Sequence, residues 1–298
     1  MSTGPHLPGW HIGVIGGSGL YEAGALDEAQ QIPVASPFGE PSGPVTMGRL
    51  EGVRFTFLAR HGAGHRLPPS DINYRANIDV LKRCGVTDVL AISAIGSLRE
   101  ELAPGHFVVP DQFIDRTCGR ARSFFGAGLT AHVALADPVC PRLSGLAAAA
   151  AEAAGAQVHH GGCYVAIEGP QFSTRAESAL YRQWGGDVVG MTAMPEARLA
   201  REAELPYAVL AMVTDYDCWR EGEAVEAASI LAVMQGNVGK ARAALAALAR
   251  SLPEERAPSP IDRALDGAIM TPRAEWDRQA AARLDAVAGR HMRALSDE

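Results

Sequence analysis

Several apolar runs in the sequence end in residues that can bind an anion. After the first run, the glycine-rich stretch 16–19 can turn its peptide N–H groups toward one ligand. After the second, "LARHG" supplies Arg60, a planar fork that fits phosphate, and His61, a second donor. Because ligands in open α/β sheets bind outside the carboxyl ends of the strands, residues at these ends should lie close together. The residues that could surround one free phosphate are Ser18, Arg60, His61, Ser93 and Thr192.

The glycine-rich stretch fits neither of the two common nucleotide-binding motifs. A dinucleotide fingerprint counted from Gly17 needs a glycine where Glu22 stands, and a P-loop needs a lysine, whereas the first lysine is Lys82. Taken alone, the stretch is compatible with a plain tight turn as well as with an anion site. Arg60 and His61 alone are compatible with a surface pair on a loop, but their place at a strand end favours the anion site.

The stretch "VTDYDCW" carries two carboxylates, Asp215 and Asp217, which point to the same face if the chain is extended. In a structural interpretation, one caps the next helix and the other is solvated. In a catalytic interpretation, burial beside the other carboxylate keeps one of them protonated, so that it donates to a heterocycle nitrogen. This requires raising its pKa from about 3.9 toward about 7. An acid that faces a phosphate cradle suggests phosphorolysis.

The elements that must hold these residues alternate between Val/Ile/Leu-rich runs and helical patterns. This alternation is typical of a largely parallel sheet that is covered on both faces. The predicted strands are 11–16, 53–60, 88–93, 106–110, 186–191 and 207–214, and the predicted helices are 73–85, 140–155 and 195–205. We therefore expect a single-domain α/β fold, in which a mixed, largely parallel twisted sheet is flanked by helices.

The C-terminal part departs from this pattern. Residues 252–262 contain three prolines and are predicted to be a linker. Residues 272–295 are helical by composition, with one apolar stripe that would dock them onto the rest of the chain, formed by Trp276, Ala280, Leu284 and Val287. We assign residues 1–251 to the main domain and residues 252–298 to a linker and a C-terminal helical extension.

The composition excludes several classes of protein. A chain of 298 residues with 47% hydrophobic content can bury a large core, and a net charge of -7 argues against a nucleic-acid surface. Its five cysteines form no CxxC pair, which indicates a reduced, cytoplasmic protein without structural zinc. We find no signal peptide and no run of about 18 apolar residues, so we expect no membrane partner.

The motifs of this chain resemble those of the trimeric purine nucleoside phosphorylases, and within them the methylthioadenosine phosphorylases. The resemblance runs in order from about residue 11 to about residue 250. The stretches that carry it are "GVIGGSGLYE", "LARHG", "PSDINYRANI", "SAIGSLREELAPG", "DQFIDRT", "IEGPQFSTRAES", "DVVGMTAMPEARLAREAELPYA" and "TDYDCW". The resemblance implies one α/β domain with a mixed, partly barrelled sheet, no metal and no cofactor. It also implies phosphorolysis of S-methyl-5'-thioadenosine to adenine and 5-methylthioribose-1-phosphate, with inorganic phosphate as co-substrate.

The resemblance also implies a role for individual residues. Met191 would contact the ribose hydroxyls, Phe172 would lie against the purine, and Ser173 with Asp215 and Asp217 would read the purine edge. The implied phosphate ligands are Ser18, Arg60, His61, Ser93, Ala94 and Thr192. The chain would form a homotrimer, in which His132 reaches the 5' group bound by the neighbouring subunit. The apolar wall around that group would be Ala227, Ile230 and Leu231.

The choice of base and of 5' substituent can be argued from two positions. A protonated carboxyl at Asp217 can donate to N7 and accept from a 6-amino group, whereas a carboxylate repels a 6-oxo group; adenine is therefore favoured. Position 227 is commonly a larger valine in the family, and Ala227 removes apolar contact at about 0.8 kcal/mol per lost CH₂. A broader nucleoside phosphorylase, acting on adenosine, 5'-deoxyadenosine or 6-oxopurine nucleosides, is the alternative. A hydrolytic nucleosidase and a non-catalytic purine-binding module are alternatives of other classes.

Overall fold

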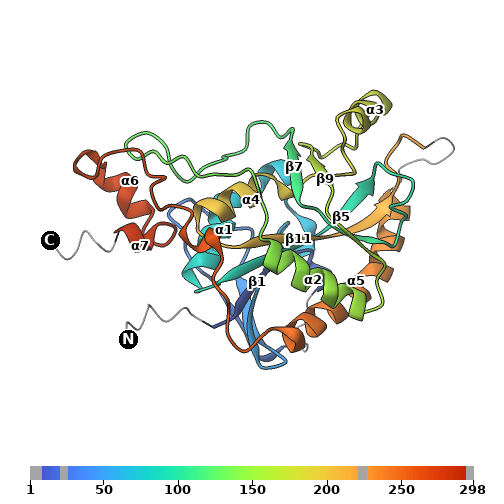
Figure 1. Ribbon diagram of the computed structural model, residues 1–298, viewed down its shortest axis with the longest axis horizontal. Coiled ribbons are helices and arrows are strands. Elements are labelled where there is room, and N and C mark those ends of the chain that lie inside the picture. The colour runs from blue at the N-terminus through green and yellow to red at the C-terminus, as the bar shows by residue number, and fades with distance from the viewer. Residues whose placement is uncertain (1–8, 21–25, 221–226, 293–298) are drawn as a thin grey trace.

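The computed structural model describes residues 9–20, 26–220 and 227–292, without the side chains of Ser18, Leu231 and residues 227–229. A mixed sheet of 11 strands forms the centre of this part of the chain (Figure 1). Its strands are β1 (His11–Gly16), β2 (Asp27–Ile32), β3 (Val45–Leu50), β4 (Val53–Ala59), β5 (Asp88–Ser97), β6 (Phe107–Val109), β7 (Gln112–Asp115), β8 (Val158–His160), β9 (Cys163–Ala166), β10 (Val188–Gly190) and β11 (Tyr207–Asp215).

The sheet is mixed, with parallel pairs in its centre. β4, β1, β5 and β11 lie parallel to one another in that order, and β9 pairs in parallel with both β10 and β7. The antiparallel pairs are β2 with β3, β3 with β4, β10 with β5 and β11 with β6. The expectation of a single-domain α/β fold with a mixed, largely parallel sheet is therefore confirmed.

The sheet branches at β5, its longest strand. β11 runs along one edge of β5, whereas the other edge is shared: β1 pairs with residues 88–91 and β10 pairs with residues 96–97. Residues 92–95 of β5 thus lie between the carboxyl ends of β1 and of the antiparallel β10, where neither strand continues the ladder. β1 and β4 end together at this place, while β5 and β11 continue, and the carboxyl ends of strands are where a doubly wound sheet accepts a ligand.

Helices cover both faces of the sheet (Figure 1). α1 (Tyr74–Arg83) and α4 (Ala193–Glu202) pack on one face, and α2 (Pro141–Ala153) and α5 (Ala227–Ser251) pack on the other. α1 begins at Asn73, whose side chain accepts from the Ala76 amide, and α3 (Arg175–Gln183) begins with a capping box built on Thr174 and Glu177. Among the described residues, none of the helices is long and apolar enough to cross a membrane.

The C-terminal residues form short elements rather than the continuous helix that their composition predicts. They are η4 (Pro260–Arg263), η5 (Arg273–Glu275), α6 (Arg278–Arg283) and α7 (Gly289–Met292). The predicted stripe nevertheless docks: Leu284 and Val287 are buried in the same core cluster as α1 and α4, and Trp276 and Ala280 pack against it. The break follows Leu284, which already has non-helical dihedral angles as the C-cap of α6.

Candidate active site

Arg60 is almost completely buried directly after β4, and its guanidinium group lies between the ends of two other strands. It is 2% exposed and donates to the carbonyl oxygens of Ile15 and Ile92, each at 3.1 Å. The Arg60 amide donates to the Gly16 carbonyl at 2.9 Å, which ties it to the glycine-rich stretch. The structure therefore brings Arg60, the end of β1 and the 92–95 stretch of β5 together, as their positions at strand ends predict.

The charge of Arg60 is already met by a partner that sequence reasoning missed. Glu196 accepts from Nε at 3.0 Å and from Nη2 at 3.1 Å, and Tyr207 donates to the same carboxylate at 2.9 Å. Burial would lower the pKa of Arg60, but the charge and hydrogen bonds of Glu196 outweigh it and hold the pKa above its usual value. These contacts occupy both Nη2 hydrogens, the Nε hydrogen and one Nη1 hydrogen, which leaves one N–H for a ligand.

His61 is half-buried and neutral near pH 7. Its Nδ1 lies 2.9 Å from the Leu67 carbonyl, and the ring stacks on His65 at 4.1 Å between centroids. Burial, followed by the positive charge of Arg60, lowers the pKa of His61 to about 4. Because a carbonyl only accepts, Nδ1 carries the proton and Nε2 is left as an acceptor. His61 can thus accept from a hydroxyl of phosphate, whereas the sequence interpretation made it a donor.

The remaining predicted phosphate ligands lie on three elements around Arg60. Ser93 and Ala94 lie in residues 92–95 of β5, which pair with neither β1 nor β10. The Ser93 hydroxyl is buried without a hydrogen-bond partner in the described part of the chain. Thr192 is the N-cap of α4, the helix that carries Glu196. Ser18 begins the 3-10 turn η1 (Ser18–Leu20), and its side chain lies outside the described residues.

The two carboxylates of "VTDYDCW" lie beside the same strand. Asp215 pairs with Gly96 in the ladder, and a Cβ atom built on Gly96 would lie 3.0 Å from Asp215 Oδ1 and 3.5 Å from Asp217 Cβ. Asp215 accepts from the Thr214 hydroxyl at 2.7 Å and from the Asp217 amide at 2.8 Å. Asp217 has a φ of 51°, a left-handed conformation that few residues other than glycine adopt.

Asp217 is the carboxyl that is open to a ligand. It is 4% exposed, and its Oδ2 has no hydrogen-bond partner among the residues that the structure describes. Burial raises the pKa of Asp217; the nearby Ser178 hydroxyl opposes this and the charge of Asp215 adds to it. The pKa of Asp215 is also raised by burial, against the hydrogen bonds from Thr214 and the Asp217 amide. A buried carboxyl with a raised pKa beside a second one is what the catalytic interpretation requires.

The segment that the sequence places against the purine lies next to Asp217. Cys218 donates its thiol hydrogen to the Ser173 carbonyl at 3.2 Å, and Arg175 donates to the Cys218 carbonyl at 3.0 Å. The Ser173 hydroxyl is buried and has no partner within the described ranges, whereas the Phe172 ring is 48% exposed. Ser173 and Asp217 are therefore brought together, with Phe172 at the edge of the site.

Met191 directly follows β10, and its side chain packs on Gly169, shortly before Phe172 and Ser173. A Cβ atom built on Gly169 would lie 2.5 Å from the Met191 sulfur, so the side chain rests on the glycine backbone. β10 pairs with residues 96–97 of β5, and Asp215 also pairs with Gly96 from the other side. Met191 therefore lies just beyond the end of β10, near the part of β5 that pairs with Asp215. The two sets of residues thus meet along β5, with the phosphate candidates near Ser93 and the purine candidates near Gly96.

The residues predicted to surround the 5' group are only partly described. Ile230 is half-buried in the first turn of α5, whose body packs on β11 and on η1, and the side chains of Ala227 and Leu231 lie outside the description. His132 is exposed in the loop between β7 and α2, where its amide donates to the Ala268 carbonyl at 2.8 Å. Within the described chain, this loop contributes no residue to the contacts around Asp217.

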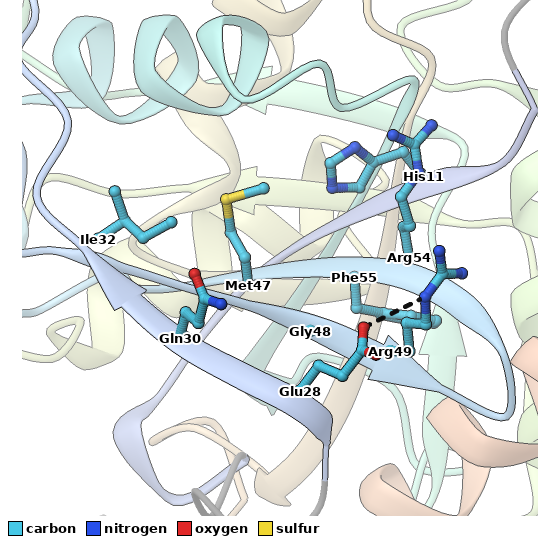
Figure 2. A pocket seen from close by; sticks show the side chains of 9 residues that line it. All are labelled: His11, Glu28, Gln30, Ile32, Met47, Gly48, Arg49, Arg54 and Phe55. Atoms are coloured by element: carbon cyan, nitrogen blue, oxygen red, sulfur yellow. Dashed lines mark ion pairs between the residues drawn. The ribbon is translucent and has the colours of Figure 1, made fainter.

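A separate hollow lies at the opposite end of the strands (Figure 2). It has a volume of about 220 Å³ and is lined by residues of β1 to β4, with His11 and Arg54 at the amino ends of β1 and β4. Glu28 and Arg49 form an exposed ion pair of 3.7 Å across it. None of the predicted site residues whose side chains the structure describes lines it, and the carboxyl ends of the strands, where those residues gather, are the candidate active site.

One group of side chains has a spacing that would suit a metal ion. Glu204, Asp266 and His291 lie close together on the C-terminal side of the molecule. Arg290 donates to both carboxylates, at 2.6 Å to Glu204 and at 2.5 Å to Asp266. The guanidinium group already balances their negative charge, and we assign no metal there.

Sequence reasoning missed Glu196 and Ser178 as members of the site. Glu196 lies at the start of the predicted helix 195–205, and 136 positions in the sequence separate it from Arg60. No local spacing marks a pair so distant. Ser178 is completely buried on α3, a helix outside the predicted elements, and a hydroxyl in a helical run carries no signal of its own.

A branched α/β sheet with anion ligands and a buried acid along one strand end defines an enzyme of the nucleoside phosphorylase type. The chain belongs to the Phosphorylase superfamily, whose sequence model matches residues 11–250. It is 56% identical over 286 residues to the S-methyl-5'-thioadenosine phosphorylase of Cereibacter sphaeroides, covering 95% of this chain and 98% of the relative. It is 54% identical over 285 residues to the S-methyl-5'-thioadenosine phosphorylase of Bradyrhizobium diazoefficiens, covering 95% of this chain and 98% of the relative.

Solved structures agree with this assignment. The crystal structure of a methylthioadenosine phosphorylase from an antarctic soil metagenomic library superimposes with a TM-score of 0.89 at 44% identity, covering 94% of this chain and 99% of that one. The methylthioadenosine phosphorylase of Schistosoma mansoni in complex with adenine gives a TM-score of 0.77 at 39% identity, covering 81% and 91%.

Proposed function

We propose that this protein catalyses the phosphorolysis of S-methyl-5'-thioadenosine to adenine and 5-methylthioribose-1-phosphate. The observation that carries the proposal is the spacing of two unsatisfied groups along β5. The Ser93 hydroxyl and Asp217 Oδ2 are both buried, and both lack partners in the described chain; Asp217 Cβ lies 3.5 Å from a Cβ atom built on Gly96. Ser93 and Gly96 are three residue steps apart along the strand, or about 10 Å, which leaves room for a ribose between a phosphate and a purine.

The chemistry follows from the two ends of this stretch. Phosphate would be held by Ser18, Arg60, His61, Ser93, Ala94 and Thr192, on the side of the ribose opposite to the base. As the bond from C1' to N9 breaks, the ribosyl group gains positive charge, which the phosphate stabilises before its oxygen bonds to C1'. In this proposal Asp217 acts in its protonated form, which the burial that raises its pKa favours, and donates its proton to N7 of the leaving adenine. No metal or cofactor takes part in this proposal.

Arg60 orients phosphate more than it neutralises it. Its charge is balanced by Glu196, and His61 is neutral, so the described ligands supply directed hydrogen bonds with little net positive charge. The nucleophile thus keeps most of its negative charge facing the ribosyl cation. This is favourable for a displacement in which the sugar carries the charge in the transition state.

The preference for a 6-aminopurine rests on Asp217 and its neighbours. A protonated Oδ2 can donate to N7, and the other carboxyl oxygen can accept from the 6-amino group. Ser173 would add its free hydroxyl to the purine edge, and Phe172 its ring to the purine face. Met191 would contact the ribose hydroxyls, and Ala227, Ile230 and Leu231 would face the 5' group. Adenosine and 5'-deoxyadenosine are the alternative substrates that a smaller residue at 227 favours.

The test is the release of adenine from S-methyl-5'-thioadenosine with and without phosphate. We expect release only with phosphate, together with stoichiometric 5-methylthioribose-1-phosphate. Release of adenine and free methylthioribose in phosphate-free buffer would instead identify a hydrolase. Tight binding of adenine without turnover in either buffer would identify a binding module.

We further propose that the protein is a cytoplasmic homotrimer in which His132 completes the site of a neighbour. Three large apolar side chains near the site are exposed in the single chain: Phe172 at 48%, Leu180 at 40% and Trp184 at 41%. The five cysteines are free thiols, which suits a reducing compartment. Sedimentation equilibrium should give three times the chain mass of 31.4 kDa, and a single-chain mass would contradict the trimer.

A further inference from the structure

Arg120 is a buried arginine outside every set of residues described above. Its side chain is 1% exposed, although it lies in the long loop between β7 and α2. Nε donates to Glu168 Oε1 at 3.3 Å and Nη2 to the Glu168 carbonyl at 2.6 Å. Nη1 lies 2.7 Å from the Met191 carbonyl, 2.8 Å from the Met194 carbonyl and 3.1 Å from the Tyr74 hydroxyl oxygen. One side chain thus joins its own loop to three other segments of the fold.

Two of these segments form the nucleoside side of the site. Glu168 directly precedes Gly169, where the chain turns toward Phe172 and Ser173, and Gly169 has a φ of 69° and supports the Met191 side chain. Met191 itself is held through its carbonyl oxygen. Arg120 therefore fixes the backbone on both sides of the contact between Met191 and Gly169.

A guanidinium group is suited to this task because its donors lie in one plane at fixed angles. The acceptors of Arg120 are three backbone carbonyls, a carboxylate and a hydroxyl, and they converge from different directions. Without the fork, the carbonyls of Glu168, Met191 and Met194 would be buried with fewer donors, and the segments that carry them would be free to move apart. Lysine offers one point charge and cannot span the same set.

We propose that Arg120 is a positioning residue for the nucleoside: it holds Met191 and the 168–173 segment at the distance that the ribose and purine require. The proposal rests on the proposed function, because Met191 is placed against the ribose hydroxyls there. Arg120 touches no reacting atom. Its effect on catalysis passes through the Met191 backbone, and the phosphate ligand Arg60 keeps its own contacts with Glu196, Ile15 and Ile92.

The test compares two substrates in one enzyme preparation. Arg120→Met fills much of the same volume but removes the fork, and kcat/KM is measured for S-methyl-5'-thioadenosine and for its 2'-deoxy analogue. We expect the unaltered protein to prefer the ribonucleoside and the variant to lose about tenfold of that preference, with a raised nucleoside KM. The KM for phosphate should change by less than about threefold, since Arg60 is held independently. A ratio of two substrates does not depend on the fraction of enzyme that is folded.

Two further variants keep the test decisive. Arg122→Gln alters a half-exposed arginine of the same loop, with 47% of its side chain exposed, and should leave the ratio unchanged. Arg120→Lys retains the charge and should give an intermediate ratio; it replaces Arg120→Met if that variant does not fold. Equal losses of rate on both nucleosides, or an unchanged ratio in Arg120→Lys and Arg120→Met, would show that Arg120 is merely structural. If the unaltered protein released no adenine with phosphate, the proposed function itself would fail, and this role with it.

Discussion

At the scale of single residues, the types of the side chains predicted the location of the site well, but they did not predict the charges of these side chains in the fold. Arg60 and His61 suggested two hydrogen-bond donors around phosphate, one of them a cation. In the fold, Glu196 pairs with Arg60, and His61 is neutral because its ring is partly buried beside that arginine. Asp217 shows the same effect in the opposite sense, since burial raises its pKa. Protonation states depend on neighbours that are distant in the chain, and therefore the sequence alone does not fix them.

The role of Asp217 leads to a prediction about base selectivity. Asp217→Asn cannot transfer a proton to N7, and we expect kcat on S-methyl-5'-thioadenosine to fall by about 10² to 10⁴. An amide can donate to a 6-oxo group, so relative activity on methylthioinosine should rise. The measurement is kcat/KM for both nucleosides at saturating phosphate.

Asp215→Asn is the matched control for that experiment. Asp215 already accepts from Thr214 and from the Asp217 amide, and its carboxyl supports the turn without an open oxygen for the base. We expect this variant to lose rate while keeping its preference for the 6-aminopurine. An unchanged preference in Asp217→Asn would refute the assignment of the acid.

At the scale of elements, strands with a continuous apolar run were predicted well, whereas elements without a regular apolar pattern were missed or cut short. The predicted strands at 11–16, 53–60 and 207–214 match β1, β4 and β11 within one residue. β5 extends beyond the predicted 88–93 to Ser97, because pairing with β10 and β11 holds a Gly- and Ser-containing stretch that has low strand propensity. β2 is polar and mostly exposed, and α5 is rich in alanine; neither shows the period used to find the others.

Gly96 of β5 pairs with β10 on one side and with β11 on the other, and this position leads to a prediction for Gly96→Ala. The new Cβ would lie 3.0 Å from Asp215 Oδ1 and 3.1 Å from Val189 Cγ1, so the Asp215 carboxylate has to move. Because that carboxylate holds the Asp217 amide, the acid moves with it, and we expect kcat/KM for the nucleoside to fall by about 10 to 100-fold. Steady-state kinetics at varied phosphate should show a phosphate KM within about twofold of the original.

Gly145→Ala provides the control for this substitution. Gly145 lies on the exposed side of α2 with no atom within 4 Å of an added Cβ, and alanine is the better helix former there. This variant should keep its kinetics unchanged. Wild-type kinetics in Gly96→Ala would show that the space under the two carboxylates is not needed for catalysis.

At the scale of the whole molecule, the candidate site and a buried ion pair of the C-terminal segment lie at opposite ends of the strands. The candidate site occupies the carboxyl ends of β1, β4, β5 and β11. The C-terminal residues reach the amino end of β5, where Arg256 donates to Asp88 at 2.5 Å and to the Thr87 carbonyl at 3.2 Å. The prolines of 252–262 indicated a linker, whereas the structure buries Arg256 and Ser259 of this segment against the sheet. A pattern of prolines indicates where regular structure stops, but it does not show whether the chain is held by a contact made elsewhere.

The contact between Arg256 and Asp88 should therefore contribute to stability without affecting catalysis. Asp88 is completely buried and is paired also with Arg142, so Arg256→Met leaves a buried carboxylate with one partner in place of two. Removing one partner of a buried ion pair lowers the free energy of unfolding by about 3 to 5 kcal/mol. Because Arg142 remains, we expect a loss at the lower end, about 3 kcal/mol. Urea denaturation followed by tryptophan fluorescence measures this loss, and kcat and both KM values should be unchanged below the transition.

Arg263→Met is the control variant. It removes an exposed ion pair with Asp266 and should lower the free energy of unfolding by less than about 1 kcal/mol. Equal losses in the two variants would mean that the buried contacts of Arg256 with Asp88, Asp262 and the Thr87 carbonyl add no more stability than one exposed ion pair.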